Sequence, residues 1–115
     1  NGLGLSITYR DVRIVSDILK DTPEGDGPDF AAYAEERAER MRRLRFAGQL
    51  QATLDMEFGE TAKARRLSYH TRKAEDPTLG LHGIAIMAGP ESVPEEFFTD
   101  AHRARVLGQP QEEPA

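Results

Sequence analysis

The residue pattern best suited to binding chemistry lies at the beginning of the chain, where two glycines precede an apolar helical pattern. Gly2 and Gly4 lead through Leu5 and Ser6 into that pattern. The first backbone N–H groups of a helix have no intrahelical acceptor and lie at the positive end of the helix dipole, so they suit an electron-rich ligand. Two glycines by themselves fit an ordinary loop better, because no third glycine or preceding strand completes a dinucleotide fingerprint.

The nearest charged side chains follow directly in the same helical pattern. They are Arg10, Asp11 and Arg13. An acid and two bases this close together on a helix more often form local pairs than a catalytic group, and Asp11 also complements the positive end of the helix dipole. We therefore expect a structural role for these charges and assign no catalytic residue.

The remaining residues give little support to other chemistries. Cysteine is absent, and His70, His82 and His102 are too far apart for a local metal motif, so we assign no metal. No serine stands in a Gly-x-Ser-x-Gly elbow, so hydrolase chemistry has no candidate nucleophile. The arginine cluster at 40–45 lies among glutamates and lacks aromatic residues for stacking, so we expect a solvated helix face and no nucleic-acid partner.

Helices are expected to position these residues, because apolar side chains recur at helical spacing along much of the chain. The pattern predicts a buried first helix over 4–19, apolar on more than one side, and then a loop over 22–28 rich in proline and glycine. Asp29 is expected to cap a long second helix whose apolar stripe reaches Phe58 and which ends at Gly59.

The second half of the chain is expected to form shorter elements. A third helix is predicted over 60–74. The glycine-punctuated apolar stretch 78–90 is predicted to be an extended connection with a short strand at 84–87. A last short helix is predicted over 95–107, and the tail 108–115 is expected to be disordered.

The composition limits the class of protein. The chain has 115 residues, which is enough for one domain at most. Hydrophobic residues make up 38% and charged residues 30%, and this composition fits an all-helical part that packs against neighbouring parts of a protein. The net charge of -5 gives no electrostatic reason to bind nucleic acid or an anionic membrane. No apolar run approaches the roughly 18 residues of a membrane span, and no signal peptide is present, so we expect a cytoplasmic protein without a membrane partner.

The beginning of the chain resembles the flavin-facing loop and helix near the end of the FAD domain in FAD-dependent aromatic-ring monooxygenases, the class built like para-hydroxybenzoate hydroxylase. The family pattern is Gly-x-Gly-Leu-(Asn/Ser), followed by a helix with an Arg-Asp-(Val/Ala) signature. The matching residues here are Gly2, Gly4, Leu5, Ser6, Arg10, Asp11 and Val12. The stretch from Tyr33 to Arg37 is similar to the Tyr-x-x-Glu-Arg signature that opens the next helix of the family, where its role is architectural.

The resemblance implies a cofactor site. Gly2, Gly4, Leu5 and Ser6 would bind FAD, with the backbone of Leu5 and Ser6 at the pyrimidine edge of the isoalloxazine ring and Gly4 allowing close approach. Ser6 stands where asparagine is commoner in the family, so the contact that the resemblance implies there is one of the backbone. Weaker similarity to C-terminal helices of bacterial members continues at 59–66, 75–77 and 103–108.

The resemblance also implies the fold class and the activity. The chain would be a mainly α, helical C-terminal fragment, with about four helices of which one is long, of an α/β FAD-binding oxidoreductase. Residues 1–20 would form the flavin-facing loop and helix, 29–107 the helical C-terminal region and 108–115 a disordered tail. The parent would be a monooxygenase that hydroxylates or epoxidises a small organic substrate with O2, with NAD(P)H as reductant.

Several parts that such an enzyme needs are missing from this sequence. It contains no Gly-x-Gly-x-x-Gly nucleotide site, no Gly-Asp segment before the loop for the ribitol, and no sheet domain for the substrate. The chain alone is therefore expected to be inactive, to bind FAD weakly and to self-associate through its first helix. The rival hypothesis is a stand-alone helical module that binds a partner protein through its apolar helix faces.

Overall fold

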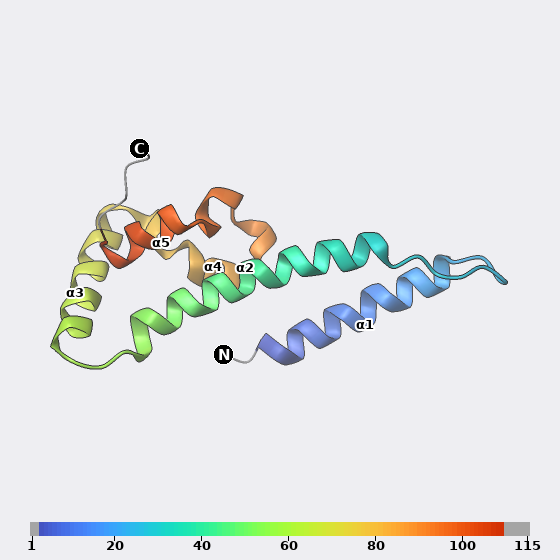
Figure 1. Ribbon diagram of the computed structural model, residues 1–115, viewed down its shortest axis with the longest axis horizontal. Helices are drawn as coiled ribbons and strands as arrows, with labels where there is room; N and C mark the ends of the chain where they lie inside the picture. Colours follow the sequence, from blue (N-terminus) through green and yellow to red (C-terminus); the bar gives the residue numbers. More distant parts are fainter. Residues whose placement is uncertain (1–2, 110–115) are drawn as a thin grey trace. The chain divides into compact units, whose positions relative to one another are not determined.

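A computed structural model describes residues 3–109. The chain divides into two compact units, Asn1–Met41 and Arg42–Ala115. The described residues contain no strand, so the predicted mainly α class is confirmed. They form five α-helices, one more than expected, and three short 3-10 helices (Figure 1). The α-helices are α1 (Leu3–Asp21), α2 (Ala31–Met56), α3 (Glu60–Glu75), α4 (Leu81–Ala88) and α5 (Asp100–Leu107), and the 3-10 helices are η1 (Pro77–Gly80), η2 (Pro90–Ser92) and η3 (Glu95–Phe98).

The first unit consists of α1, a connecting segment and the beginning of α2. Proline and glycine interrupt the helix here as predicted, and a turn is closed by the hydrogen bond from the Asp26 N–H to the Pro23 carbonyl, 3.1 Å long. The Asp29 carboxylate then accepts the Ala31 N–H at 2.9 Å. Asp29 therefore satisfies one of the first free donors of α2, as the sequence predicted.

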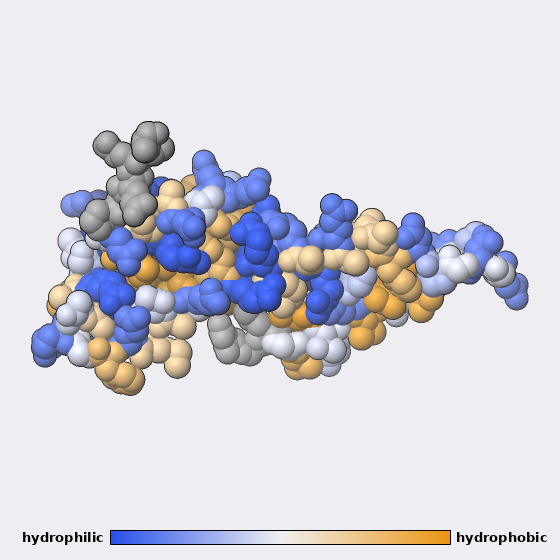
Figure 2. Space-filling view, viewed as in Figure 1, coloured by the Kyte–Doolittle hydropathy of each residue, from blue (hydrophilic) through white to orange (hydrophobic). Residues whose placement is uncertain are grey.

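The burial predicted for the first helix is wrong for this chain. Among the described residues of the first unit, no side chain is fully buried. Leu5 and Tyr9 are 66% and 68% exposed, and Val12 and Leu19 are also more than half exposed. Figure 2 shows this apolar surface along α1. The pattern of apolar residues predicted the helix correctly, but it could not show what covers the second apolar side.

The core of the molecule lies in the second unit. Helix α2 contributes Phe46, Ala47, Leu50 and Leu54. The other elements of this unit add the remaining core residues, which are Tyr69, Leu79, Ala85, Val93, Phe98, Val106 and Leu107. The rings of Phe46 and Phe98 pack edge to face, with centroids 6.0 Å apart. The apolar stripe predicted along the second helix therefore points into the core only from Leu44 to Leu54.

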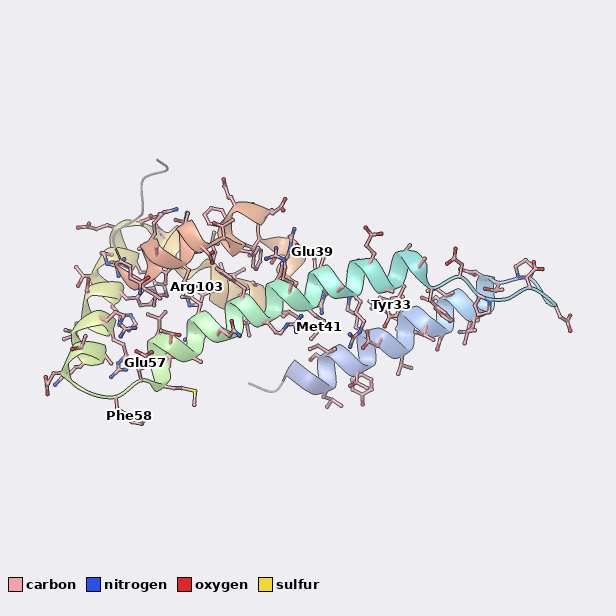
Figure 3. The ribbon with its side chains drawn as sticks, in the orientation of Figure 1. Tyr33, Glu39, Met41, Glu57, Phe58 and Arg103 are labelled. Atoms are coloured by element: carbon pink, nitrogen blue, oxygen red, sulfur yellow. The ribbon has the colours of Figure 1, made fainter. Side chains whose placement is uncertain are left out.

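The second helix ends earlier than predicted. It ends at Met56, and Gly59, with φ +104°, instead precedes α3. Phe58, expected on the buried stripe, is 96% exposed and points away from the helices in Figure 3. Two arginines of α3 explain the early end, because Arg66 donates to the Glu57 carbonyl at 2.8 Å and Arg65 pairs with the Glu57 carboxylate at 2.8 Å.

The extended connection and short strand predicted within 78–90 are also wrong. Asp76 caps η1 by accepting the Thr78 N–H at 3.1 Å, and α4 follows without a break. Gly83 does not interrupt α4, which buries His82 and Ala85 on its inner side. Burial against the core therefore outweighs the low helix propensity of glycine. The helix ends at Gly89, whose φ of +101° favours glycine.

The last predicted helix is divided in two. η3 and α5 are separated at Thr99, whose hydroxyl accepts the His102 N–H at 3.3 Å as the cap of α5. Gly108 ends α5 in the left-handed conformation, with φ +70°. Most of the predicted disordered tail, residues 110–115, lies outside the described residues.

Candidate functional site

The described part of the predicted flavin-binding segment lies in the first turn of α1. Gly4, Leu5 and Ser6 are helical and exposed, so they do not form the separate loop that the sequence suggested. Gly2 lies outside the described residues. The first N–H groups of a helix lack intrahelical acceptors, and no acidic residue lies in the first turn of α1 to compete for them. This segment can therefore donate backbone hydrogen bonds to an electron-rich group.

Gly4 is not required by the fold of the chain itself. A Cβ atom added at Gly4 meets nothing within 4 Å. Its φ is not among the positive values found at Gly25, Gly59, Gly89 and Gly108. A need for glycine at this position would thus come from a group outside the chain that approaches the backbone closely.

Asp11 is held by the beginning of α2. The Tyr33 hydroxyl donates to Asp11 Oδ1 at 2.6 Å, and the Arg37 Nε donates to the same oxygen at 3.0 Å. Figure 3 shows Tyr33 on the side of α2 that faces α1. These hydrogen bonds, that from Arg37 first and that from Tyr33 second, lower the pKa of Asp11, while the bond to Asp11 raises the pKa of Tyr33.

A second contact joins the same two helices. The Arg10 guanidinium donates two hydrogen bonds to the Glu36 carboxylate, at 2.7 and 3.3 Å. Arg10 and Asp11, expected to have a structural role, thus contact side chains of α2. Tyr33, Glu36 and Arg37 all serve to join the two helices. Arg13 is exposed. This arrangement leaves the carboxylate of Asp11 occupied by structural contacts.

The second unit contains a groove that the sequence did not predict. The groove has a volume of about 530 Å³ and lies between η1, η3 and α5. Its lining residues are Asp76, Thr78, Glu96, Phe97, Thr99, Ala101, His102 and Arg105. Arg105 Nη2 pairs with Asp76 Oδ2 at 3.0 Å, so the two opposite charges at one side of the groove balance each other. Hydrogen bonds from Thr78 and Arg105 lower the pKa of Asp76.

Two buried histidines belong to this unit. His82 is 3% exposed and His102 is 2% exposed. Burial, and the nearby charge of His102, lower the pKa of His82 to about 4, and burial and the positive charge of Arg105 lower the pKa of His102. Both imidazoles are therefore neutral near pH 7. Their separation in the sequence gave no sign that they share one core.

The hydrogen bonding of these imidazoles is incomplete. Both ring nitrogens of His102 and the Nδ1 of His82 are buried and have no hydrogen-bond partner among the described residues. The third histidine, His70, is exposed on α3. Within residues 3–109 no group of three or more His, Cys, Asp or Glu side chains could hold a metal ion. His102 is thus a buried polar group that faces a groove without a metal cluster beside it in this part of the chain.

Comparisons of the chain with protein-family models, with curated proteins and with solved structures found no match. In the part of the chain that the structure describes, no helix has both the length and the apolar character to cross a membrane.

Proposed function

We propose that this chain is the C-terminal helical part of an FAD-dependent monooxygenase. The parent would be a cytoplasmic α/β enzyme that hydroxylates or epoxidises a small organic substrate with O2 and NAD(P)H. The sequence pattern from Gly2 to Val12 is the observation that carries this proposal. The chain itself lacks the nucleotide and substrate sites, so it is expected to contribute one edge of the flavin site and a helical support.

The geometry at the start of α1 supports this proposal. Gly4 and Leu5 lie in an exposed first turn, where their backbone N–H groups have no intrahelical acceptor and no carboxylate competes, and Ser6 follows them in the same turn. The space beside Gly4 is open, so a flat ring can approach the backbone. The contacts that hold Asp11 to α2 fix this helix about two turns further along.

The residues of this chain would bind and orient the flavin. The N–H groups of Leu5 and Ser6 would donate to its pyrimidine edge, where donors stabilise the negative charge that the ring gains on reduction. The flavin would supply the electron transfer between NAD(P)H and O2. No side chain of this segment is given an acid or base role, since Asp11 is engaged with Tyr33 and Arg37.

A glycine replacement in the full-length enzyme tests the flavin contact. Gly4→Val places a branched side chain where the ring would approach, whereas the fold of the chain has room for it. We expect bound flavin to fall to roughly a tenth of the wild-type content or less, a loss of about 1.4 kcal/mol or more in binding free energy. The measurement is the ratio of flavin to protein absorbance, together with NAD(P)H-dependent O2 consumption.

Gly83→Val provides a matched control. Gly83 also lies in the first turn of a helix, and a Cβ added there meets nothing within 4 Å. This variant should keep normal flavin content and turnover. Equal flavin content in the Gly4→Val enzyme and the Gly83→Val enzyme would contradict the proposal.

The exposed apolar side of α1 favours a second candidate, a helical module that binds a partner protein. Leu5, Tyr9, Val12 and Leu19 form the exposed apolar positions of this helix. The reading frame upstream of Asn1 separates the two candidates. A preceding segment of Gly-Asp-Ala type supports the flavoenzyme, and a stop codon and a methionine directly upstream support the module.

A further inference from the structure

The connection between α1 and α2 contains the one aspartate of this sequence that a glycine follows, Asp26 before Gly27. Residues 23–29 are all exposed, and none of them lies in a helix. Gly25, directly before the pair, has a φ of +93°, and a Cβ atom added at Gly27 meets nothing within 4 Å. The pair therefore lies in an open segment. Neither residue belongs to the segment proposed to contact flavin.

An aspartate followed by glycine is able to react with its own main chain. The glycine nitrogen attacks Cγ of the aspartate side chain and forms an N–C bond, and the carboxyl hydroxyl leaves with the N–H proton as water. Water then opens the resulting cyclic imide. Opening at Cγ restores aspartate, whereas opening at the main-chain carbonyl gives isoaspartate, in which the chain continues through the side chain. The water released in the first step is taken up in the second, so no other reactant is needed. Glycine favours the attack because it has no Cβ beside the nitrogen.

Both reacting groups of this pair are free in the structure. Among the described residues, neither the Asp26 carboxylate nor the Gly27 N–H has a hydrogen-bond partner. The Asp26 N–H donates to the Pro23 carbonyl at 3.1 Å, and this bond holds the backbone before the pair. It fixes neither χ1 nor ψ of Asp26, which are the two rotations that bring the Gly27 nitrogen to Cγ.

The other aspartates do not combine these features. Most of them lie within α-helices, namely Asp11, Asp17, Asp21, Asp55 and Asp100. A helix holds ψ in one narrow range, so the main-chain nitrogen that follows the aspartate is kept away from Cγ. The remaining two carboxylates are engaged, because Asp29 accepts the Ala31 N–H at 2.9 Å and Asp76 accepts the Thr78 N–H at 3.1 Å. Sequence and conformation therefore both single out Asp26.

We propose that Asp26 converts spontaneously to isoaspartate, because the open connection lets the Gly27 nitrogen reach the Asp26 carboxyl group. The product adds one methylene group to the main chain between α1 and α2, and the former main-chain carboxyl group becomes the free carboxylate. The net charge of the chain does not change. This free carboxylate is the group that a protein isoaspartyl methyltransferase methylates with S-adenosylmethionine, so the modified chain is a substrate for that class of enzyme.

Incubation of the full chain at neutral pH and physiological temperature tests the proposal. Isoaspartate is measured over days by methylation with protein isoaspartyl methyltransferase and labelled S-adenosylmethionine. Electron-transfer fragmentation of the tryptic peptide 21–37 then locates the modified residue, and this separates it from any isoaspartate formed by deamidation of Asn1. We expect isoaspartate to form at Asp26 about ten-fold faster or more than at any other aspartate. The imide, lighter than the unmodified peptide by one water, should appear in the same peptide.

Three variants separate the effect of the glycine from that of the conformation. Gly27→Ala has room for its Cβ and should slow the reaction by about ten-fold or more. Asp26→Glu should remove isoaspartate from the peptide 21–37. Ala101→Gly creates a second aspartate–glycine pair after Asp100, at an exposed position in α5, and Asp100 should stay unmodified while Asp26 reacts as in the wild type.

Three results would overturn the proposal. The first is a wild-type chain that forms no isoaspartate at Asp26 during the incubation. The second is an unchanged rate at Asp26 in the Gly27→Ala variant, which would show that the Gly27 nitrogen does not control the reaction. The third is an equal rate at Asp100 and Asp26 in the Ala101→Gly variant, which would show that the open connection does not select Asp26.

Discussion

Two buried imidazoles are expected to make the stability of the chain depend on pH. The pKa of His82 is lowered by burial to about 4, and that of His102 is also lowered, whereas an unfolded histidine titrates near pH 6.5. Below about pH 6.5 the unfolded state therefore binds more protons than the folded state. The free energy of unfolding should fall as the pH drops from about 6.5 towards 4, by roughly 1.4 kcal/mol for each unit of pKa difference.

Chemical unfolding at a series of pH values measures this effect. His82→Gln removes one of the two titrating groups and should reduce the slope of stability against pH in this window. His70→Gln, at an exposed position, should leave the slope unchanged. Stability that is constant from pH 6.5 to 4 in the wild type would show that the two imidazoles are not buried in the neutral form. The pKa values of Asp11 and Asp76 are lowered as well. The stability that these two carboxylates contribute is therefore present above about pH 3.8 and is lost as the pH falls below this value.

At the scale of the element, the cap of α5 is the contact most open to a simple test. The Thr99 hydroxyl accepts the His102 N–H at 3.3 Å and so satisfies a free donor of the first turn. Thr99→Ala should lower the free energy of unfolding by about 1 kcal/mol, the usual cost of losing such a cap. Thermal or denaturant unfolding, followed by circular dichroism, gives this value.

Thr71→Ala is the matched control for the cap. Thr71 is exposed within α3, where its hydroxyl donates to the Leu67 carbonyl at 3.1 Å. Alanine has the higher helix propensity, so this variant should be neutral or slightly more stable. An equal loss of stability in both variants would show that Thr99 acts through general packing and not through capping.

The elements differ in how far the sequence could predict them. Helix α3 was predicted to within one residue, because local residues mark both of its ends. Glu60 lies in its first turn, and Asp76 and Pro77 directly follow its last residue. Helix α4 was predicted as an extended segment, since Gly80 and Gly83 lower the local helix propensity. Its helical form depends on burying Ala85 in the core, where this residue is fully inaccessible. A single sequence does not show that contact.

The candidate sites differ in the same way. Gly4, Leu5 and Ser6 are neighbours in the sequence, so the local pattern placed them together at the start of a helix, although it predicted neither their helical form nor their exposure. The groove brings Asp76 and Arg105 together from two distant elements. No spacing rule links these positions, and only the packing of α5 beside η1 and η3 creates the site.

At the scale of the whole molecule, the two units differ in what holds them together. Among the described residues, all fully buried side chains belong to the unit Arg42–Ala115. The unit Asn1–Met41 instead relies on half-buried side chains and on the contacts of Arg10 and Asp11 with α2. Salt screens such exposed ion pairs, while it affects apolar burial less. The first unit is therefore the part of the chain most dependent on further contacts.

This difference predicts that the full chain associates through α1. Leu5, Tyr9, Val12 and Leu19 are each more than half exposed, and covering them removes apolar surface from water. Sedimentation analysis should show a mass that rises with protein concentration, and Val12→Asp should shift the chain towards the monomer because it places a charge on this surface. Thr61→Asp, at an exposed position in the first turn of α3, should leave association unchanged.

A wild-type chain that stays monomeric at all concentrations, and whose two units melt in one sharp transition, would show that α1 needs no partner. Association in the wild type that is lost in Val12→Asp would instead identify this side of α1 as the surface that a larger parent enzyme or a separate partner must cover.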